Sequence, residues 1–142
     1  MKKIVLTLAV LSAAYFVQAQ QVNQSEVPEK VKSAFDANTH GATVMSWEKV
    51  KSGYKATYSI ENNESTALFN SSGKLLEQEF TVSQNDLPDN IVEYLGGVEE
   101  KQTINKVIIL KDVSGNKSYK VKIHDMYYFF DPVGTFTKKI KS

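Results

Sequence analysis

The sequence predicts an α+β fold in which one helix followed by four antiparallel strands occurs twice. Three observations predict it. A segment that starts with Val27-Pro28 at helical spacing has a counterpart that starts with Leu87-Pro88. A turn of the form Phe-(Asn/Asp)-x-x-Gly occupies residues 69–73 and again residues 130–134. After each helical segment, apolar residues recur at every second position. A period of about 60 residues indicates two copies of one supersecondary unit.

The first 19 residues have the composition of an export signal. Lys2 and Lys3 precede an apolar stretch over residues 4–16, and Val17-Gln18-Ala19 resembles a signal-peptidase site. This stretch is shorter than a helix that crosses a bilayer, so the pattern favours a cleaved signal over a membrane anchor. We therefore expect a periplasmic or secreted protein that starts at Gln20 and has no membrane span after cleavage.

The charge balance narrows the classes of possible partner. Once Lys2 and Lys3 leave with the signal, 15 of the 17 lysines remain against 16 Asp and Glu residues, and there is no arginine. A near-neutral chain has no long-range field that attracts nucleic acid or anionic lipid.

The chain also lacks cysteine, so no disulfide compensates for the small core of a unit of about 60 residues. We therefore expect the two units to form one cooperative body.

The domain boundaries follow from the two units. The predicted segments are a signal (1–19), a loosely ordered polar segment (20–26), a first repeat unit (27–82), a linker (83–86) and a second repeat unit (87–142). Each unit begins with a helix, because proline suits the first turn and an acidic residue follows it. One face of each helix is apolar: Val27, Val31, Ala34 and Phe35 in the first, and Leu87, Ile91, Tyr94 and Leu95 in the second. We expect the first helix to end near Gly41 and the second at Gly96-Gly97.

Alternating apolar and polar residues predict the strands. The expected strands are residues 43–50, 54–60, 65–69 and 74–82 in the first unit, and 103–111, 118–124, 126–130 and 135–140 in the second. The central hairpin is longer in the first unit. We assign its extra residues to the loop over residues 61–64, where insertions cost little. Antiparallel strands with a helix on one face give an α+β fold.

The repeated motifs resemble those of a known group of proteins. An exported, cysteine-free chain with two [Val/Leu]-Pro-x-x-[Val/Ile] helix starts and two Phe-(Asn/Asp)-x-x-Gly turns is similar to the PepSY-like proteins, which are periplasmic or secreted bacterial proteins described as β-lactamase-inhibitor-protein-like. The resemblance covers about residues 27–141. It implies two α+β units with a helix behind each curved sheet. In the inhibitor relatives the exposed sheet face and its loops bind a protein. No motif in this sequence matches an inhibitory residue of those relatives. The resemblance therefore implies a fold but does not identify a target.

No motif of a known enzyme class is present, and we expect no catalytic residue, no metal and no cofactor. His40, which follows the first helix, is expected to be solvated. His124 and Asp125 lie where one strand turns into the next, and a zinc or copper site there needs further ligands such as Asp112 and Asp131. Glu77 and Glu79 share one strand face, and a solvated face explains them without acid–base chemistry.

The strongest candidate for a binding surface is an aromatic run in the second unit. Successive strand residues point to opposite faces, so Tyr127 and Phe129 are expected on the face away from the helix. Lys120 and Lys122 of the preceding strand lie on that same face. Aromatic rings flanked by lysine are typical of a recognition surface. The alternative is that the rings pack against the other unit or that the alternation is offset by one. The only tryptophan, Trp47, fits either the core or a surface anchor.

These observations favour a non-enzymatic binding module outside the cytoplasm, which recognises a protein or peptide through its open sheet face. Two alternatives stay open: an inhibitor of a secreted or periplasmic hydrolase such as a peptidase or β-lactamase, and a structural component of the envelope that assembles through strand edges. A metal-dependent enzyme that uses His124 and Asp125 is the least favoured hypothesis.

Overall fold

The structure, a computed structural model, describes residues 19–98 and 103–142. The predicted signal lies outside the described residues, apart from Ala19. Within these residues, nine strands form one antiparallel sheet in chain order, with two α-helices packed on it. The elements are β1 (Gln20–Val22), η1 (Gln24–Glu26), α1 (Glu29–Thr39), β2 (Val44–Val50), β3 (Gly53–Ile60), β4 (Asn63–Phe69), β5 (Leu75–Val82), η2 (Gln84–Asp86), α2 (Asp89–Val98), β6 (Ile104–Asp112), β7 (Lys117–Ile123), β8 (Met126–Phe130) and β9 (Phe136–Lys141), where η marks a short 3-10 helix.

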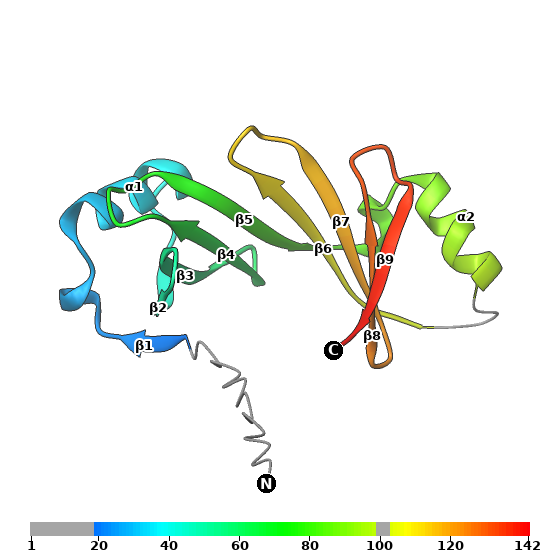
Figure 1. The fold of residues 1–142 in the computed structure, drawn as a ribbon, viewed down its shortest axis with the longest axis horizontal. Helices are drawn as coiled ribbons and strands as arrows, with labels where there is room; N and C mark the ends of the chain where they lie inside the picture. The colour runs from blue at the N-terminus through cyan, green and yellow to red at the C-terminus, as the bar shows by residue number, and fades with distance from the viewer. Residues whose placement is uncertain (1–18, 99–102) are drawn as a thin grey trace, which may run out of the picture.

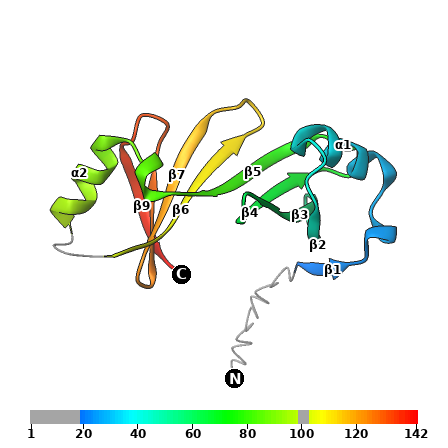
Figure 2. The same cartoon turned by 180° about the vertical axis from the view of Figure 1, so that it is seen from behind.

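After β1, which has no counterpart in the second half, the described residues follow the order 3-10 helix, α-helix and four strands in each half. The helices lie toward opposite ends of the long axis of the molecule, and β5 and β6 cross its middle (Figures 1 and 2). Pairing of β5 with β6 over residues 77–82 and 107–112 joins the two halves into one continuous sheet. The class is therefore α+β with an open antiparallel sheet.

Two segments for which the sequence predicted no helix or strand are ordered. Residues 20–26 form β1, which pairs with β2, and then η1. The predicted linker, residues 83–86, forms η2 and its cap. In both segments a carboxylate closes the 3-10 turn: Glu26 accepts a hydrogen bond from the Asn23 backbone N–H (2.8 Å), and Asp86 accepts one from Ser83 (3.0 Å). This reciprocal capping pattern is readable in sequence.

The predicted helix faces are confirmed. Val31, Phe35, Ile91 and Leu95 are all buried, with at most 5% of their surface exposed. The predicted end of the second helix is wrong, because Gly96 and Gly97 lie inside α2, which continues to Val98. Each glycine costs about 1 kcal/mol in a helix interior, and burial of the apolar face of α2 outweighs that cost.

The predicted origin of the longer first hairpin is also wrong. Ile60 pairs with Asn63, and Ile123 pairs with Met126, so both hairpins close with a two-residue turn. The difference lies in the strands: β3 and β4 have 8 and 7 residues, whereas β7 and β8 have 7 and 5. Glu61 and Asn62 both have positive φ angles (49° and 66°). Such a turn matches the twist of the flanking strands, so no larger loop is needed.

Each half has its own hydrophobic core beneath its helix. The first comprises Val27, Val31, Phe35, Trp47, Ala56, Tyr58, Ala67 and Phe69. The second comprises Leu87, Ile91, Leu95, Val107, Val121, Ile123, Tyr128 and Phe130. Phe35 is central to the first core, with its ring 5.6 Å from that of Trp47 and 5.3 Å from that of Tyr58.

Both cores lie on the same face of the sheet. Residues that are directly opposed on neighbouring antiparallel strands point to one face. One row of such residues runs from the first core to the second: Tyr58, Ser65, Phe80, Ile109, Tyr119 and Phe130. In the described part of the chain the opposite face carries no helix, and we call it the helix-free face.

Candidate functional site

The structure places the predicted aromatic residues as the alternation of β8 requires. Tyr128 and Phe130 are buried in the second core, whereas Tyr127 and Phe129 are half-buried on the helix-free face. Lys120 pairs with Phe129, and Lys122 pairs with Tyr127, so the two lysines share that face. The structure therefore brings together all four residues of the predicted surface.

Lysine ammonium groups lie over both aromatic rings. The Nζ atom of Lys120 is 4.6 Å from the ring centre of Tyr127 and 5.8 Å from that of Phe129. Lys122 Nζ is 5.3 Å from the Tyr127 ring centre. These are cation–π distances, at which a ring face attracts an ammonium group. The rings thus hold the lysines in place on the sheet surface.

Two further residues complete this surface, and sequence analysis missed both. Lys138 of β9 pairs with Phe129, and its Nζ lies 4.9 Å from the centre of that ring. Ile108 of β6 pairs with Lys120 and is only 4% exposed, although it belongs to neither core. We call Lys120, Lys122, Tyr127, Phe129, Lys138 and Ile108 the aromatic–lysine patch. The alternation of side chains along β9 and β6 places Lys138 and Ile108 on one face of their strands. Only the pairing of these strands with their neighbours shows that this face adjoins the aromatic rings.

Carboxylates border the patch on one side. The Nζ atom of Lys120 lies 4.0 Å from Oε1 of Glu79 on β5. Lys106 of β6 pairs in register with Lys122, and its Nζ atom lies 3.9 Å from Oε1 of Glu64. Both ion pairs are partly exposed, so each contributes little to stability. Around the two rings, four lysines therefore face two carboxylates, and the aromatic–lysine patch is locally positive.

The corresponding positions of the first half do not form such a patch. The turns at Phe69 and Phe130 align Thr66 and Leu68 with Tyr127 and Phe129. The neighbouring strand supplies Lys55 and Thr57, and Lys55 pairs with Glu48. Aromatic rings and clustered lysines on the helix-free face are therefore a property of the second half of the described chain.

The residues weighed as metal ligands do not converge. His124 and Asp125 form the β7–β8 turn, and Asp125 lies 3.7 Å from Lys141. Asp112 and Asp131 lie at the other end of β7. Lys117 at the start of β7 pairs with Lys111, the residue before Asp112, and Tyr119 pairs with Phe130, the residue before Asp131. Over residues 19–98 and 103–142, no three His, Asp or Glu side chains form a metal-binding group.

Asp112 and Asp131 instead stabilise turns, as Asn70 does. Each side-chain oxygen accepts backbone N–H groups two and four residues ahead, at 2.8–3.1 Å. The third residue after each one is a glycine with φ between 82° and 88°. The Phe-(Asn/Asp)-x-x-Gly motif is thus a structural turn, and the β6–β7 turn at Asp112 has the same hydrogen bonds.

We expect the Asp112 turn to weaken in acid. Hydrogen bonds from Asn116 hold the pKa of this carboxyl below its ordinary value of 3.8. Because folding lowers the pKa of Asp112, its ionised carboxylate stabilises the folded protein at any pH above the pKa of the unfolded chain, which is about 4. This stabilisation is lost as the pH falls through the pKa of the folded protein. An NMR titration measures this directly. Asp112→Asn should keep the turn, as Asn70 shows, and remove the pH dependence. A measured pKa at or above 3.8 would contradict the expectation.

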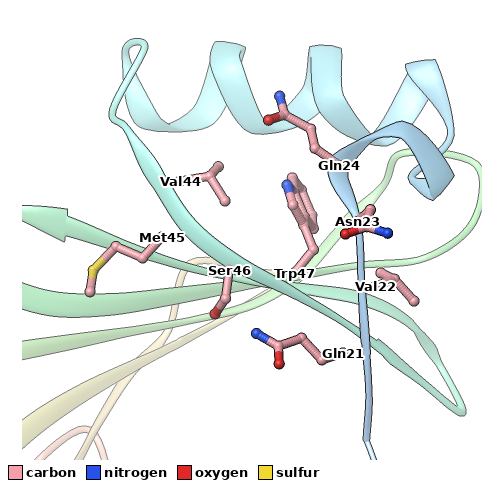
Figure 3. Close-up of a pocket in the computed structure, with 8 residues that line it drawn as sticks. All are labelled: Gln21, Val22, Asn23, Gln24, Val44, Met45, Ser46 and Trp47. Atoms are coloured by element: carbon pink, nitrogen blue, oxygen red, sulfur yellow. The ribbon is translucent and has the colours of Figure 1, made fainter.

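The other single residues have structural positions. His40 caps α1 in the left-handed conformation (φ 53°) and is exposed. Glu77 and Glu79 lie on the helix-free face, where they pair in register with Asp112 and Leu110. Trp47 belongs to the first core and is 3% exposed. Figure 3 shows its indole rising from β2 toward α1, between Val44 and Gln24.

Two buried polar atoms in the described chain have no hydrogen-bond partner: the Nε1 atom of Trp47 and the hydroxyl of Tyr58. Burial raises the pKa of Tyr58, and the nearby amide of Gln78 partly opposes that shift. Trp47, in contrast, lines two hollows at the surface of the first half. Its unpaired N–H group therefore belongs to a residue that borders both hollows.

Neither helix of the described residues has the length and apolar character needed to cross a bilayer. A scan against protein-family models finds no match. A search of curated proteins also finds no significant match.

Solved structures with the same fold come from Bacteroides. A protein of Bacteroides eggerthii, provisionally described as periplasmic, has a TM-score of 0.72 at 14% identity, with 81% of this chain and 88% of that chain covered. A DUF2874 family protein of Bacteroides uniformis has a TM-score of 0.70 at 14% identity, over 80% and 88% of the two chains. A BLIP-like protein of Bacteroides fragilis has a TM-score of 0.66 at 16% identity, over 80% and 85%.

At such identities the likeness establishes a shared fold. It supports the β-lactamase-inhibitor-protein-like part of the resemblance, while membership of the PepSY group stays a prediction. The description of the first neighbour agrees with the periplasmic or secreted location that the export signal predicts. This chain therefore has the BLIP-like α+β fold that these Bacteroides proteins share.

Proposed function

We propose that this chain is an exported, non-enzymatic binding protein composed of two copies of one α+β unit, and that the aromatic–lysine patch holds its protein or peptide partner. The observation that carries the proposal is the placement of Tyr127 and Phe129 on the helix-free face, each with lysine ammonium groups over its ring. Tyrosine, with tryptophan and arginine, is enriched among the residues that dominate binding energy at protein interfaces.

The charge of the patch indicates the chemistry of the partner. Lys106, Lys120, Lys122 and Lys138 outnumber the carboxylates of Glu64 and Glu79 around it. An acidic protein surface with at least one apolar side chain complements this arrangement, because carboxylates pair with the lysines while the apolar group packs on the rings. Strong salt dependence of binding follows from this chemistry.

Paired double variants test the proposed site. We expect Tyr127→Ala with Phe129→Ala to weaken binding of a partner captured from native envelope extract by at least about 30-fold. The matched control is Thr66→Ala with Leu68→Ala at the corresponding positions of the first half, which should leave affinity within about twofold. Biolayer interferometry with the purified partner measures both. Equal affinity of the two double variants would place the binding site elsewhere.

Inhibition of a hydrolase is a second candidate function, favoured by the shared fold of the BLIP-like protein. Inhibition is one form of protein binding, so the same patch is its first test. Excess protein should then slow one member of a panel of secreted peptidases and β-lactamases, and the Tyr127→Ala, Phe129→Ala variant should lose that effect. Binding without any inhibition would leave the binding proposal and remove this second one.

A further inference from the structure

A hollow in the first half, distant in sequence from the aromatic–lysine patch, has the features of a small-ligand site. It has a volume of about 260 Å³ and lies between α1, the start of β2 and the indole of Trp47. Phe35 and Val44 supply apolar wall, and Lys32, Asp36 and Gln24 supply polar groups. A second hollow of about 410 Å³, between β1 and β2, shares Gln24, Val44 and Trp47 with it. We call the first hollow the Trp47 pocket.

A residue that lines this space carries an unpaired, buried hydrogen-bond donor. The side chain of Trp47 is 3% exposed, and its Nε1 atom has no acceptor in the described chain. In Figure 3 the nitrogen lies on the side of the indole toward Val44, which lines both hollows. A buried N–H group without a partner costs free energy unless a ligand or water accepts its hydrogen bond.

The fold does not require this donor. Trp47 pairs with Val22, and Val107 occupies the corresponding place opposite Val82 in the second half. Val107 fills the second core with no polar atom. An indole N–H at this position therefore adds a polar group where an aliphatic side chain suffices for packing.

The charged residues of the wall identify the complementary group. Lys32 already forms an ion pair with Glu29, with 2.6 Å between Nζ and Oε2. Asp36, one turn further along α1, makes no ion pair among the described residues. The pocket thus offers one free donor and one free carboxylate beside apolar side chains. A ligand that matches them carries an acceptor oxygen and a cationic amine on a small apolar body.

We propose that the Trp47 pocket binds an α-aminoacyl group with a free ammonium, as found in an amino acid or at the N-terminus of a peptide. The ammonium pairs with Asp36, and the carbonyl or carboxylate oxygen accepts the hydrogen bond of Trp47 Nε1. An apolar side chain packs against Phe35 and Val44. This inference stands apart from the proposed function, because it uses no residue of the aromatic–lysine patch.

Ligand titrations test the chemical class. Trp47 is the only tryptophan in the chain, so its fluorescence reports the pocket directly. We expect L-leucine or the tripeptide Leu-Gly-Gly to change that fluorescence, and whichever binds more tightly identifies the source of the group. N-acetyl-L-leucinamide, which keeps the carbonyl and lacks the ammonium, should bind at least about tenfold more weakly. Absence of binding by both free-amine probes at about 10 mM would overturn the proposal.

Two variants of the mature chain test the assigned contacts. Asp36→Asn, on the exposed surface of α1, should weaken the better probe by about tenfold. Glu93→Gln, an exposed acidic residue of α2, is the matched control and should leave binding unchanged. Trp47→Phe keeps an aromatic ring and removes the donor; calorimetry should show a similar loss, with circular dichroism confirming the fold. Unchanged affinity of Asp36→Asn would overturn the assignment even if Trp47→Phe failed to fold.

Discussion

Replacement of Phe35 by alanine should lower the free energy of unfolding by about 3–5 kcal/mol. Phe35 is 2% exposed, and three aromatic rings surround it, those of Trp47, Tyr58 and Phe69, with centre distances of 5.3–6.5 Å. Truncation removes this buried area and the edge-to-face ring contacts, and it leaves a cavity that the sheet cannot close. Urea denaturation measures the loss. Val133→Ala, at a residue that is 74% exposed, is the control and should change stability by less than about 0.5 kcal/mol.

The same experiment tests whether the two halves unfold together. Trp47 fluorescence reports the first core, whereas far-UV circular dichroism reports both halves. Because β5 and β6 pair over six residues on each strand, we expect both signals of Phe35→Ala to show a single shared transition at lower urea. A fluorescence transition well before the dichroism transition would show that the halves unfold independently. A loss below about 1 kcal/mol would contradict the central role of Phe35.

Replacement of Gly73 by alanine should destabilise the protein by about 2–3 kcal/mol. Gly73 has a φ of 88°, and a Cβ atom there would lie 2.6 Å from the backbone oxygen of Lys30 in α1. The left-handed conformation penalises the new side chain, and the helix start must move away from the turn. The Phe-(Asn/Asp)-x-x-Gly motif therefore needs its glycine for conformation and for docking of the helix.

Two matched glycines separate these contributions. Gly134→Ala should cost less than Gly73→Ala, about 1–2 kcal/mol, because the nearest atoms belong to the Asn90 side chain. That side chain can move if it gives up its 2.8 Å hydrogen bond to Val133. Gly115→Ala has the same turn conformation (φ 82°), and its nearest neighbour is the flexible Lys111 side chain at 3.9 Å, so it should show the conformational cost alone. Thermal or urea unfolding ranks the three. Equal losses would show that helix docking contributes nothing.

Local pattern predicted much of the described fold. The buried faces of α1 and α2 were predictable because helical spacing alone decides which residues share a face. The placement of Tyr127 and Phe129 opposite Tyr128 and Phe130 was predictable for the same reason, with a period of two. Both inferences require only the type of element and one buried residue as reference.

The errors concern places where distant residues decide. Residues 20–26 are polar, yet Val22 pairs opposite Trp47, so a strand forms where composition suggested a loose segment. Gly96 and Gly97 remain helical although glycine is typical of a helix end. The extra residues of the first hairpin extend β3 and β4, because pairing across the hairpin continues up to its two-residue turn.

Periodicity within a few residues was enough to predict the two helix faces, the alternation of the strands and the aromatic pair on the face of β8 away from the helix. Three features became visible only in the folded chain: both helices share one face, Lys138 and Ile108 complete the aromatic–lysine patch, and the Trp47 N–H has no acceptor among the described residues. These features depend on strand register and packing between segments far apart in the chain, which local periodicity does not encode.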